Sequence, residues 1–202
     1  MAVSRRAVFF DKDGTLITNV PHNVDPDRIH LAPSAREALR SLSARDYALF
    51  VVTNQSGVAH GLFAEQALVG VQRRVAELMS REGRSLQGFY YCPHSPDGTV
   101  RRYAFRCPCR KPAPGLLFAA ADEHRIELEE SWMIGDILDD VEAGNRAGCR
   151  TILIDNGGET EWLVSAWRRP IAIVRDLLAA ATFIQQFDER SCHGAARLVS
   201  DV

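Results

Sequence analysis

The sequence predicts an α/β fold in which helices cover both faces of a mainly parallel central sheet. Short apolar segments bounded by turn residues alternate with longer amphipathic segments, and this alternation is typical of βα units. The chain has 202 residues, of which 46% are apolar and 25% charged, so it can bury a hydrophobic core without disulfides. We therefore predict a single domain over residues 1–188 with no large cap domain, and a C-terminal tail at 189–202.

Each predicted strand is a short apolar segment. The strands are expected at 7–10, 48–52, 89–91, 132–134 and 151–154, with a further candidate at 171–174. Helices are expected between them, at 34–44, 64–81, 115–124, 138–147 and 175–187. Ser34 and Glu37 have the spacing of a capping box for the first helix, and the helix at 64–81 should be the longest, ending before Gly83. Residues 190–202 show no clear periodicity.

Three polar segments directly follow predicted strands: DKDGTL at 11–16, TNQSG at 53–57 and GDILDD at 135–140. Because the carboxyl ends of parallel strands meet at one edge of a sheet, these segments should converge there. Asp11 and Asp13 repel each other unless a cation lies between them, and with Asp136 they offer hard oxygen ligands suited to Mg²⁺. Taken alone, DKDGTL has a second interpretation as a polar turn, and TNQSG as an ordinary loop.

A group of neutral donors and one lysine has the chemistry of a phosphate site. Thr53, Asn54 and Ser56 follow the second strand, and Lys111 precedes the helix that begins near residue 115. Such groups can stabilise a phosphoryl group whose charge spreads over its oxygens during transfer. We therefore expect a small phosphorylated metabolite as the partner of this site.

Cys92, His94, Cys107 and Cys109 form a candidate zinc site. Three thiolates and one imidazole are the ligands of a closed structural site, which leaves no position for a catalytic water. Reduced cysteines without metal are the alternative, and a disulfide is disfavoured because the chain shows no secretion signal. We predict a zinc-binding loop over 92–109 whose metal fixes the two cations that follow it over the pocket.

Charge and hydropathy argue against other classes of partner. The formal net charge is −2, which gives no overall attraction to nucleic acid or to an anionic membrane, and no apolar segment approaches membrane-spanning length. We expect a cytoplasmic protein that binds neither nucleic acid nor membrane and that acts as a monomer.

The segments DKDGTL, TNQSG, RKPAPG and GDILDD, in this order, resemble the four motifs of haloacid-dehalogenase (HAD) superfamily phosphatases over about three quarters of the chain. The Cys-x-His and Cys-x-Cys pairs ahead of RKP are similar to those of the D-glycero-D-manno-heptose 1,7-bisphosphate phosphatase group, which includes histidinol-phosphate phosphatases. The resemblance implies a Rossmann-like HAD fold and a Mg²⁺-dependent phosphatase that removes the C7 phosphate of the heptose bisphosphate. Histidinol phosphate or another small phosphomonoester is the alternative substrate, and a non-catalytic zinc-containing interaction protein is the alternative of a different class.

The resemblance also implies a role for each motif residue. Asp11 would be the nucleophile that forms an aspartyl-phosphate, and Asp13 the general acid and base. Mg²⁺ would be held by the Asp11 side chain, the Asp13 backbone carbonyl and Asp136, with structural Zn²⁺ as the second metal. Thr53 and Asn54 would hold the phosphoryl group, which Lys111 would neutralise.

Further residues are implied in substrate binding and support. They are Arg110, Gln55, Ser56, Asn19 and His22, of which His22 has a second interpretation as a surface residue. Asp140 would support the metal site, orient Lys111 or cap a helix. The chain departs from the family pattern at Ile137, where members often carry Lys or Arg.

Overall fold

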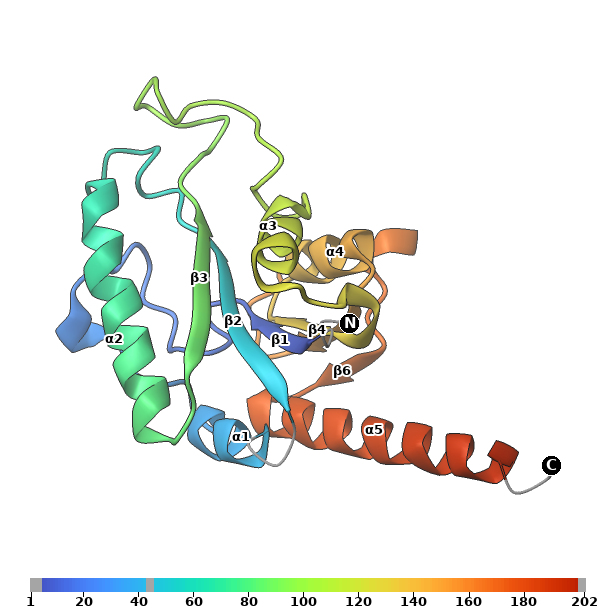
Figure 1. The fold of residues 1–202 in the computed structure, drawn as a ribbon. Helices are drawn as coiled ribbons and strands as arrows, with labels where there is room; N and C mark the ends of the chain where they lie inside the picture. Colours follow the sequence, from blue (N-terminus) through green and yellow to red (C-terminus); the bar gives the residue numbers. More distant parts are fainter. Residues whose placement is uncertain (1–4, 43–45, 200–202) are drawn as a thin grey trace.

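The computed structural model describes residues 5–42 and 46–199, and a six-stranded sheet forms its centre (Figure 1). The strands are β1 (Arg6–Phe10), β2 (Tyr47–Asn54), β3 (Leu86–Cys92), β4 (Trp132–Gly135), β5 (Arg150–Ile154) and β6 (Ala172–Val174). They lie in the order β3-β2-β1-β4-β5-β6, and every neighbouring pair is parallel. All six predicted strands and the predicted fold class are confirmed.

Five α-helices and several short 3₁₀ turns connect the strands in the described part of the chain. The helices are α1 (Ala35–Ser41), α2 (Leu68–Arg81), α3 (Gly115–His124), α4 (Leu138–Ala147) and α5 (Leu177–Val199). The 3₁₀ turns are η1 (Pro26–Arg28), η3 (Glu65–Ala67), η4 (Leu128–Glu130) and η5 (Ala166–Arg168). Both α3 and α4 begin and end at the predicted residues.

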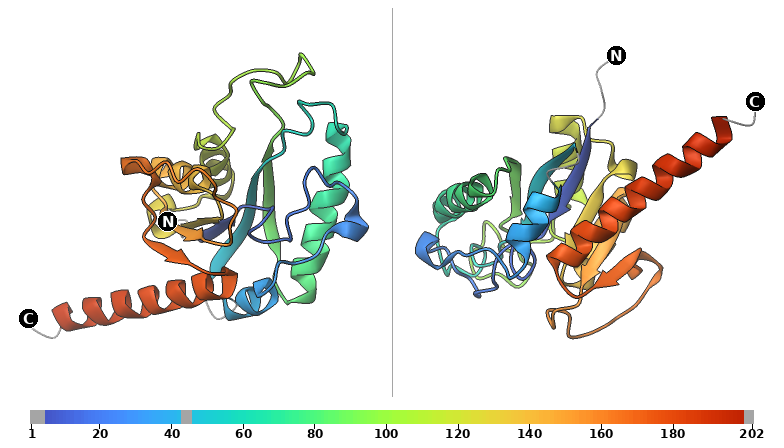
Figure 2. Two further views of the ribbon diagram at one scale, coloured as in Figure 1. Left: turned by 180° about the vertical axis from the view of Figure 1, so that it is seen from behind. Right: turned by 90° about the horizontal axis from the view of Figure 1, so that it is seen from below.

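The two faces of the sheet are covered by different helices. Side chains alternate along each strand, so Val8 and Phe10 of β1 pack with α1, α2 and α5, whereas Ala7 and Phe9 pack with α3 and α4. Figure 1 shows α2 on one side of the sheet and α3 and α4 on the other, and Figure 2 shows α5 running beyond the sheet toward the C-terminus. This two-sided burial explains why the strands are almost entirely apolar.

The predicted capping box at Ser34 is wrong. Ser34 has a left-handed backbone with φ of 70°, and its side chain makes no cap hydrogen bond to α1. A residue that caps a helix through its side chain ordinarily has an extended backbone, which aims the oxygen at the first turn. The Ser34 hydroxyl instead accepts a hydrogen bond from the Leu178 backbone N–H at 3.4 Å. The predicted end of this helix, at residue 44, lies outside the described residues.

Two helix predictions need correction. The segment predicted as one helix at 64–81 divides into η3 and α2, with Gly83 adopting a positive φ just beyond it. The longest described helix is α5, which continues to Val199 rather than ending at residue 187. Good helix formers such as Ala195, Ala196 and Leu198 sustain a helix without the apolar periodicity on which the prediction relied. The domain boundary at residue 188 stays a prediction.

The sheet topology determines where a site can form. The chain turns from one half of the sheet to the other between β1 and β4, and ligands of open α/β sheets bind beyond the carboxyl ends of strands at such a reversal. Residues 93–114 connect β3 to α3 without regular secondary structure and arch beyond the end of β3 (Figure 1). Among the described residues, no helix has the length and apolar character needed to cross a membrane.

Candidate active site

Acidic side chains meet where β1 and β4 end. Asp11 directly follows β1 and donates its backbone N–H to the Ile134 carbonyl of β4 at 2.9 Å, while Asp136 directly follows β4. Carboxylate oxygens of Asp11, Asp136 and Asp140 all lie within 4.8 Å of one another, and all three residues are buried. The predicted convergence of the first and last motifs is confirmed.

Lys111 lies among these carboxylates. Its ammonium nitrogen is 2.5 Å from Asp11 Oδ1 and 2.6 Å from Asp140 Oδ1, and it donates a hydrogen bond to the Val52 carbonyl at 3.0 Å. Burial alone would favour the neutral amine, but the Asp11 and Asp140 carboxylates hold the pKa of Lys111 above its ordinary value. Lys111 is therefore a cation placed beside the predicted nucleophile.

Asp140 serves two of the purposes considered for it. One oxygen pairs with Lys111, and the other accepts a hydrogen bond from the Ile137 backbone N–H at 3.4 Å, at the start of α4. Its side chain is fully buried. It thus orients Lys111 and caps the helix at the same time.

The charges of this cluster do not balance. With all six groups ionised, four carboxylates face two ammonium groups, and the largely buried site carries two excess negative charges. The groups are Asp11, Asp13, Asp136 and Asp140 on the acidic side and Lys12 and Lys111 on the basic side. Burial, with a smaller contribution from Asp11, raises the pKa of Asp136 to about 6. A divalent cation with a preference for oxygen ligands, as Mg²⁺ has, fits both the donor atoms and the charge deficit.

Asp13 is held by two neighbours and has a perturbed pKa. Lys12 lies 2.9 Å from its carboxylate, and Gln55 Nε2 donates to its Oδ2 at 3.2 Å. Burial raises the pKa of Asp13, and the nearby Asp11 charge raises it further, although Lys12 opposes the shift. A carboxyl with a raised pKa keeps its proton closer to neutral pH, where it can then act as a general acid.

Residues at the end of β2 form the third side of the site. Thr53 is buried, and its hydroxyl accepts a hydrogen bond from Gln55 Nε2 at 3.0 Å. Both polar atoms of the Asn54 side chain bond the Lys111 backbone at 3.0 Å, one to its carbonyl and one to its N–H. The Asn54 side chain thus fixes the position of Lys111, which sequence reasoning did not anticipate.

The remaining predicted substrate residues differ in their exposure and in whether they line a cavity at this cluster. Asn19 is exposed and lines a cavity of about 360 Å³ together with Asp136. Ser56 lies within the TNQSG segment, two residues after the end of β2, and is half-buried. His22 is exposed with a φ of 54° and is outside the described lining of that cavity.

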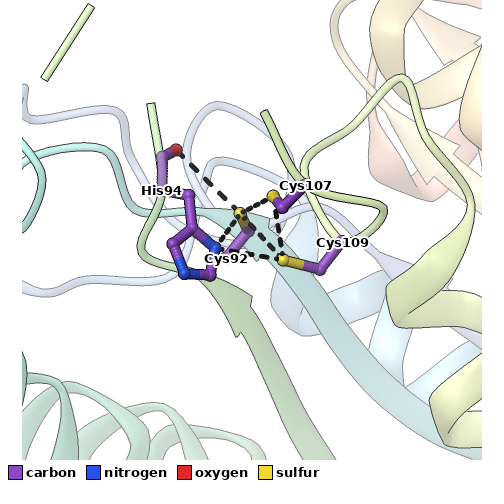
Figure 3. A group of neighbouring side chains, drawn as sticks. All are labelled: Cys92, His94, Cys107 and Cys109. Carbon is purple, nitrogen blue, oxygen red and sulfur yellow. Dashed lines mark hydrogen bonds between the residues drawn. The ribbon is translucent and has the colours of Figure 1, made fainter. Parts of the chain in front are cut away.

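The Cys and His side chains predicted to bind zinc point toward one another (Figure 3). Cys109 Sγ is 3.2 Å from both Cys92 Sγ and Cys107 Sγ, and Cys92 Sγ is 3.4 Å from Cys107 Sγ. His94 Nδ1 is 3.4 Å from Cys109 Sγ and 3.6 Å from Cys92 Sγ. These sulfurs are too far apart for disulfides, which require about 2.05 Å.

This arrangement has the dimensions of a tetrahedral metal site. Zn–S bonds of about 2.3 Å place two sulfur ligands about 3.8 Å apart, slightly more than the separations in the cluster. Burial raises the pKa of the Cys92 thiol, so its thiolate needs a cation to be stable there. The four residues therefore fit Zn²⁺ as a ligand set.

The zinc-type cluster is joined directly to Arg110. The guanidinium Nη1 of Arg110 donates to the His94 carbonyl at 3.2 Å, and Arg110 follows Cys109 in the chain. Arg110 and Lys111 line a second cavity of about 360 Å³, together with Arg106, Asp139 and Arg146. The loop thus presents Arg110 to a basic recess next to the carboxylate cluster.

Sequence reasoning missed three residues of the site. Lys12 is almost completely buried against Asp13, and no spacing rule distinguished it from a surface lysine. Asn156 and Gly158 lie beside Asp136 in the cavity that also contains Asn19. Asn156 and Gly158 could have been predicted from the sequence, because DNGGE directly follows β5 and the other polar motifs likewise lie at the ends of β1, β2 and β4.

Comparison with known proteins agrees with this geometry. The HAD-hydrolase-like family model matches residues 108–180. The D-glycero-beta-D-manno-heptose-1,7-bisphosphate 7-phosphatase of Yersinia pestis is 37% identical over 160 residues, which cover 78% of this chain and 84% of that protein. The enzyme of the same name from Escherichia coli K12 is 38% identical over 160 residues, covering 78% and 83%.

Solved structures show the same similarity. D,D-heptose 1,7-bisphosphate phosphatase from B. bronchiseptica, in complex with magnesium and phosphate, matches with a TM-score of 0.72 at 27% identity, covering 90% of this chain and 98% of that one. A HAD-like protein from Mesorhizobium loti matches with a TM-score of 0.76 at 33% identity, covering 90% and 88%. The buried acidic cluster and the relatives that share most of the chain lead to one conclusion. The chain is a phosphatase that belongs to the D-glycero-beta-D-manno-heptose-1,7-bisphosphate 7-phosphatase family of HAD-like hydrolases.

Proposed function

We propose that this phosphatase removes the C7 phosphate of D-glycero-β-D-manno-heptose 1,7-bisphosphate in a Mg²⁺-dependent reaction. The observation that carries the proposal is the buried cluster of Asp11, Asp136 and Lys111, in a chain 37–40% identical to phosphatases named for this substrate. The expected products are the heptose 1-phosphate and inorganic phosphate.

We assign Mg²⁺ to the carboxylates of Asp11 and Asp136 and to the Asp13 backbone carbonyl. The two uncompensated negative charges of the cluster support this assignment, and the B. bronchiseptica relative is described in complex with magnesium. When bound, Mg²⁺ supplies positive charge that offsets repulsion between the Asp11 carboxylate and the anionic phosphoryl group. Asp140 keeps its bond to Lys111 in this arrangement.

In the first chemical step, a carboxylate oxygen of Asp11 forms a bond to phosphorus and the bond from phosphorus to the sugar oxygen breaks. Asp13 donates its proton to that sugar oxygen, a role supported by its raised pKa. Lys111, 2.5 Å from Asp11 Oδ1, and the Thr53 hydroxyl are positioned to stabilise the phosphoryl oxygens. The result is an aspartyl-phosphate on Asp11 and a released alcohol.

In the second step, a water oxygen forms a bond to phosphorus and the bond from phosphorus to Asp11 breaks. The Asp13 carboxylate accepts a proton from this water, which returns Asp13 to its starting state. Inorganic phosphate leaves and the Asp11 carboxylate is restored. Gln55 donates hydrogen bonds to both Asp13 and Thr53. It can therefore hold the general acid and the hydroxyl that contacts the phosphoryl group in fixed positions relative to each other.

We further propose that Zn²⁺ bound by Cys92, His94, Cys107 and Cys109 keeps Arg110 in place for substrate recognition. The bond from Arg110 to the His94 carbonyl supports this role, since the same residue supplies a ligand and an anchor. A guanidinium offers a planar pair of donors suited to a phosphate or to neighbouring hydroxyls. Asn19, which lines the cavity beside Asp136, and Ser56 complete the proposed substrate-binding set, whereas His22 lies outside the described lining of that cavity.

A substrate panel tests the function. The values of kcat/KM should be measured with Mg²⁺ for the α and β anomers of the heptose 1,7-bisphosphate, for heptose 7-phosphate and for histidinol phosphate. The last compound is included because Ile137 places no charge next to Asp136. We expect the β-bisphosphate to be the best substrate, and Asp11→Asn to lower its turnover by about 10³-fold or more.

The control is Asp122→Asn, an exposed change on α3 that should leave turnover intact. A preference for histidinol phosphate would overturn the assigned substrate. Full turnover by the Asp11→Asn variant would overturn the assigned nucleophile.

A further inference from the structure

The segment that follows β5 is bonded to both acidic loops of the active site. β5 pairs with β4 in parallel, so its carboxyl end lies at the same edge of the sheet as Asp136. The Asn156 side chain donates to the Gly14 carbonyl at 2.7 Å, and Glu159 Oε2 accepts the Leu138 backbone N–H at 2.7 Å. One contact is to the loop after β1, and the other is to the first residue of α4.

The same segment closes one side of the Asp136 carboxylate. A Cβ atom added at Gly158 would overlap Asp136 Oδ2, and a Cβ atom added at Gly14 would overlap the same oxygen. The other carboxylate oxygen, Oδ1, accepts a hydrogen bond from the Thr15 hydroxyl at 3.3 Å. The rotamer of Asp136 is therefore defined by contacts at both of its oxygens.

At Gly158 the requirement for glycine is one of space. Its φ lies outside the left-handed region, so an alanine can adopt the same backbone. The atom that the new methyl group would displace is the end of a flexible side chain, so the cost of the overlap is a moved carboxylate rather than a disrupted fold. Gly157 is the opposite case, because its φ is 87° and an added Cβ would have nothing within 4 Å.

Asn156 positions Gly158 as well as Gly14. Its Oδ1 accepts the Gly158 backbone N–H at 2.9 Å, while its Nδ2 donates to Gly14. The two glycines that contact Asp136 Oδ2 are thus bonded to one amide side chain. Residues 155–158 are exposed, so these contacts contribute little to the hydrophobic core.

We propose that Asn156, Gly158 and Glu159, here termed the β5 clamp, are positioning residues that fix the Asp136 carboxylate for Mg²⁺. The proposal rests on the assignment of Mg²⁺ to Asp11 and Asp136. The clamp provides no metal ligand. It acts by restricting the rotamers of one ligand, and partners that orient a metal ligand commonly change metal affinity by about 10- to 100-fold when they are removed.

The test measures Mg²⁺ affinity of the metal-free protein by isothermal titration calorimetry, without substrate. We expect Gly158→Ala to weaken binding by about tenfold and Asn156→Ala to weaken it by a similar factor. Thr160→Ala is the control, since it shortens an exposed side chain directly after Glu159 without touching Asp136, and its Mg²⁺ affinity should stay within about twofold of the parent. Circular dichroism and thermal unfolding in chelator verify that each variant is folded.

Asp136→Asn separates the failure of this proposal from that of the metal assignment. If Asp136→Asn leaves Mg²⁺ affinity unchanged, the metal site itself is misassigned, and the clamp fails with it. If Asp136→Asn abolishes binding while Gly158→Ala and Asn156→Ala bind as the parent does, the clamp alone is overturned. Equal weakening by Thr160→Ala and Gly158→Ala would also overturn it, because a general disturbance of the loop would then explain the effect. Should Gly158→Ala not fold, Asn156→Ala decides by the same readout.

Discussion

At the scale of single residues, the site is organised by Lys111. Its ammonium group bonds Asp11 and Asp140, and its backbone is held by the Asn54 side chain. In the sequence it comes two residues after the last cysteine of the zinc-type cluster. One buried cation between two carboxylates fixes their geometry, but it leaves the cluster short of positive charge. The same residue thereby links the predicted nucleophile to the loop that carries the zinc-type cluster.

The pKa of Asp136 predicts how metal binding depends on pH. Its folded-state value of about 6 exceeds the ordinary value of 3.8, so the protonated form favours folding. In metal-free protein this stabilisation is complete below about pH 4 and is lost as the pH rises through about 6. Mg²⁺ requires the carboxylate, so the increase in Tm on adding Mg²⁺ should be larger near pH 7.5 than near pH 5.

The check is thermal unfolding with and without saturating Mg²⁺ at both pH values. Asp136→Asn serves as the control, since it should remove most of the difference. An equal or larger Mg²⁺ effect near pH 5 would contradict the assignment of Asp136 as a ligand.

At the scale of elements, we predict that the loop between β3 and α3 depends on a bound metal. Residues 93–114 have no helix or strand, and holding such a segment in one conformation costs about 1–2 kcal/mol per residue in backbone entropy. Cys107→Ser should remove bound zinc and raise KM for the phosphorylated sugar through loss of the Arg110 position, while circular dichroism changes little. Elemental analysis and steady-state kinetics measure the two effects.

Cys149→Ser is the matched control for this prediction. Cys149 is buried in the turn between α4 and β5 and is not one of the four grouped Cys and His side chains, so the same chemical change there should leave the zinc content unaltered. An unchanged KM in verified zinc-free protein would show that the loop does not position Arg110.

The elements also show what the sequence can and cannot predict. Helix positions could be predicted where an apolar face repeats at helical spacing, as in α4, because burial on one face imposes that period. Ser34 was misread since its spacing to Glu37 says nothing about its own φ, which the packing of α1 against α5 constrains. The continuation of α5 was missed because its C-terminal residues favour a helix without an apolar face.

The candidate site likewise contains residues that the sequence predicts and contacts that it does not. Asp11, Asp136 and the Cys and His ligands were predictable, since short motifs at strand ends carry them. The bond from Asn54 to the Lys111 backbone and the contact of Gly158 with Asp136 join residues far apart in the chain. Such pairs depend on strand order and side-chain orientation, which the residue types alone do not specify.

At the scale of the whole molecule, α5 is anchored to the core as far as Asp188. The rings of Phe183 and Phe187 meet Trp132 edge-on at 6.0 and 5.2 Å, and the Tyr47 hydroxyl donates to the Asp188 carboxylate at 3.0 Å. The domain boundary at residue 188 remains a prediction, which a shortened chain can test. Truncation after Arg190 should therefore leave the Tm and the turnover nearly unchanged.

Phe187→Ala in the full chain is the comparison for this truncation. It should cost about 3 kcal/mol, because it removes a ring from the α5 contact with Trp132. Urea unfolding measures the free energy of unfolding of the truncated chain and of the Phe187→Ala variant. Light scattering of the same samples tests the predicted monomer. A truncated chain that loses as much stability as Phe187→Ala would move the boundary of the domain past residue 190.

The whole chain should act as a C7 phosphatase, and ³¹P NMR follows the two phosphates of the substrate separately. The wild-type protein with Mg²⁺ and D-glycero-β-D-manno-heptose 1,7-bisphosphate should convert the C7 phosphomonoester signal to inorganic phosphate, leaving the C1 phosphate signal in place. Asp11→Asn under the same conditions should leave both sugar phosphates intact. Loss of the C1 phosphate, or release of phosphate that does not require Asp11, would contradict the account.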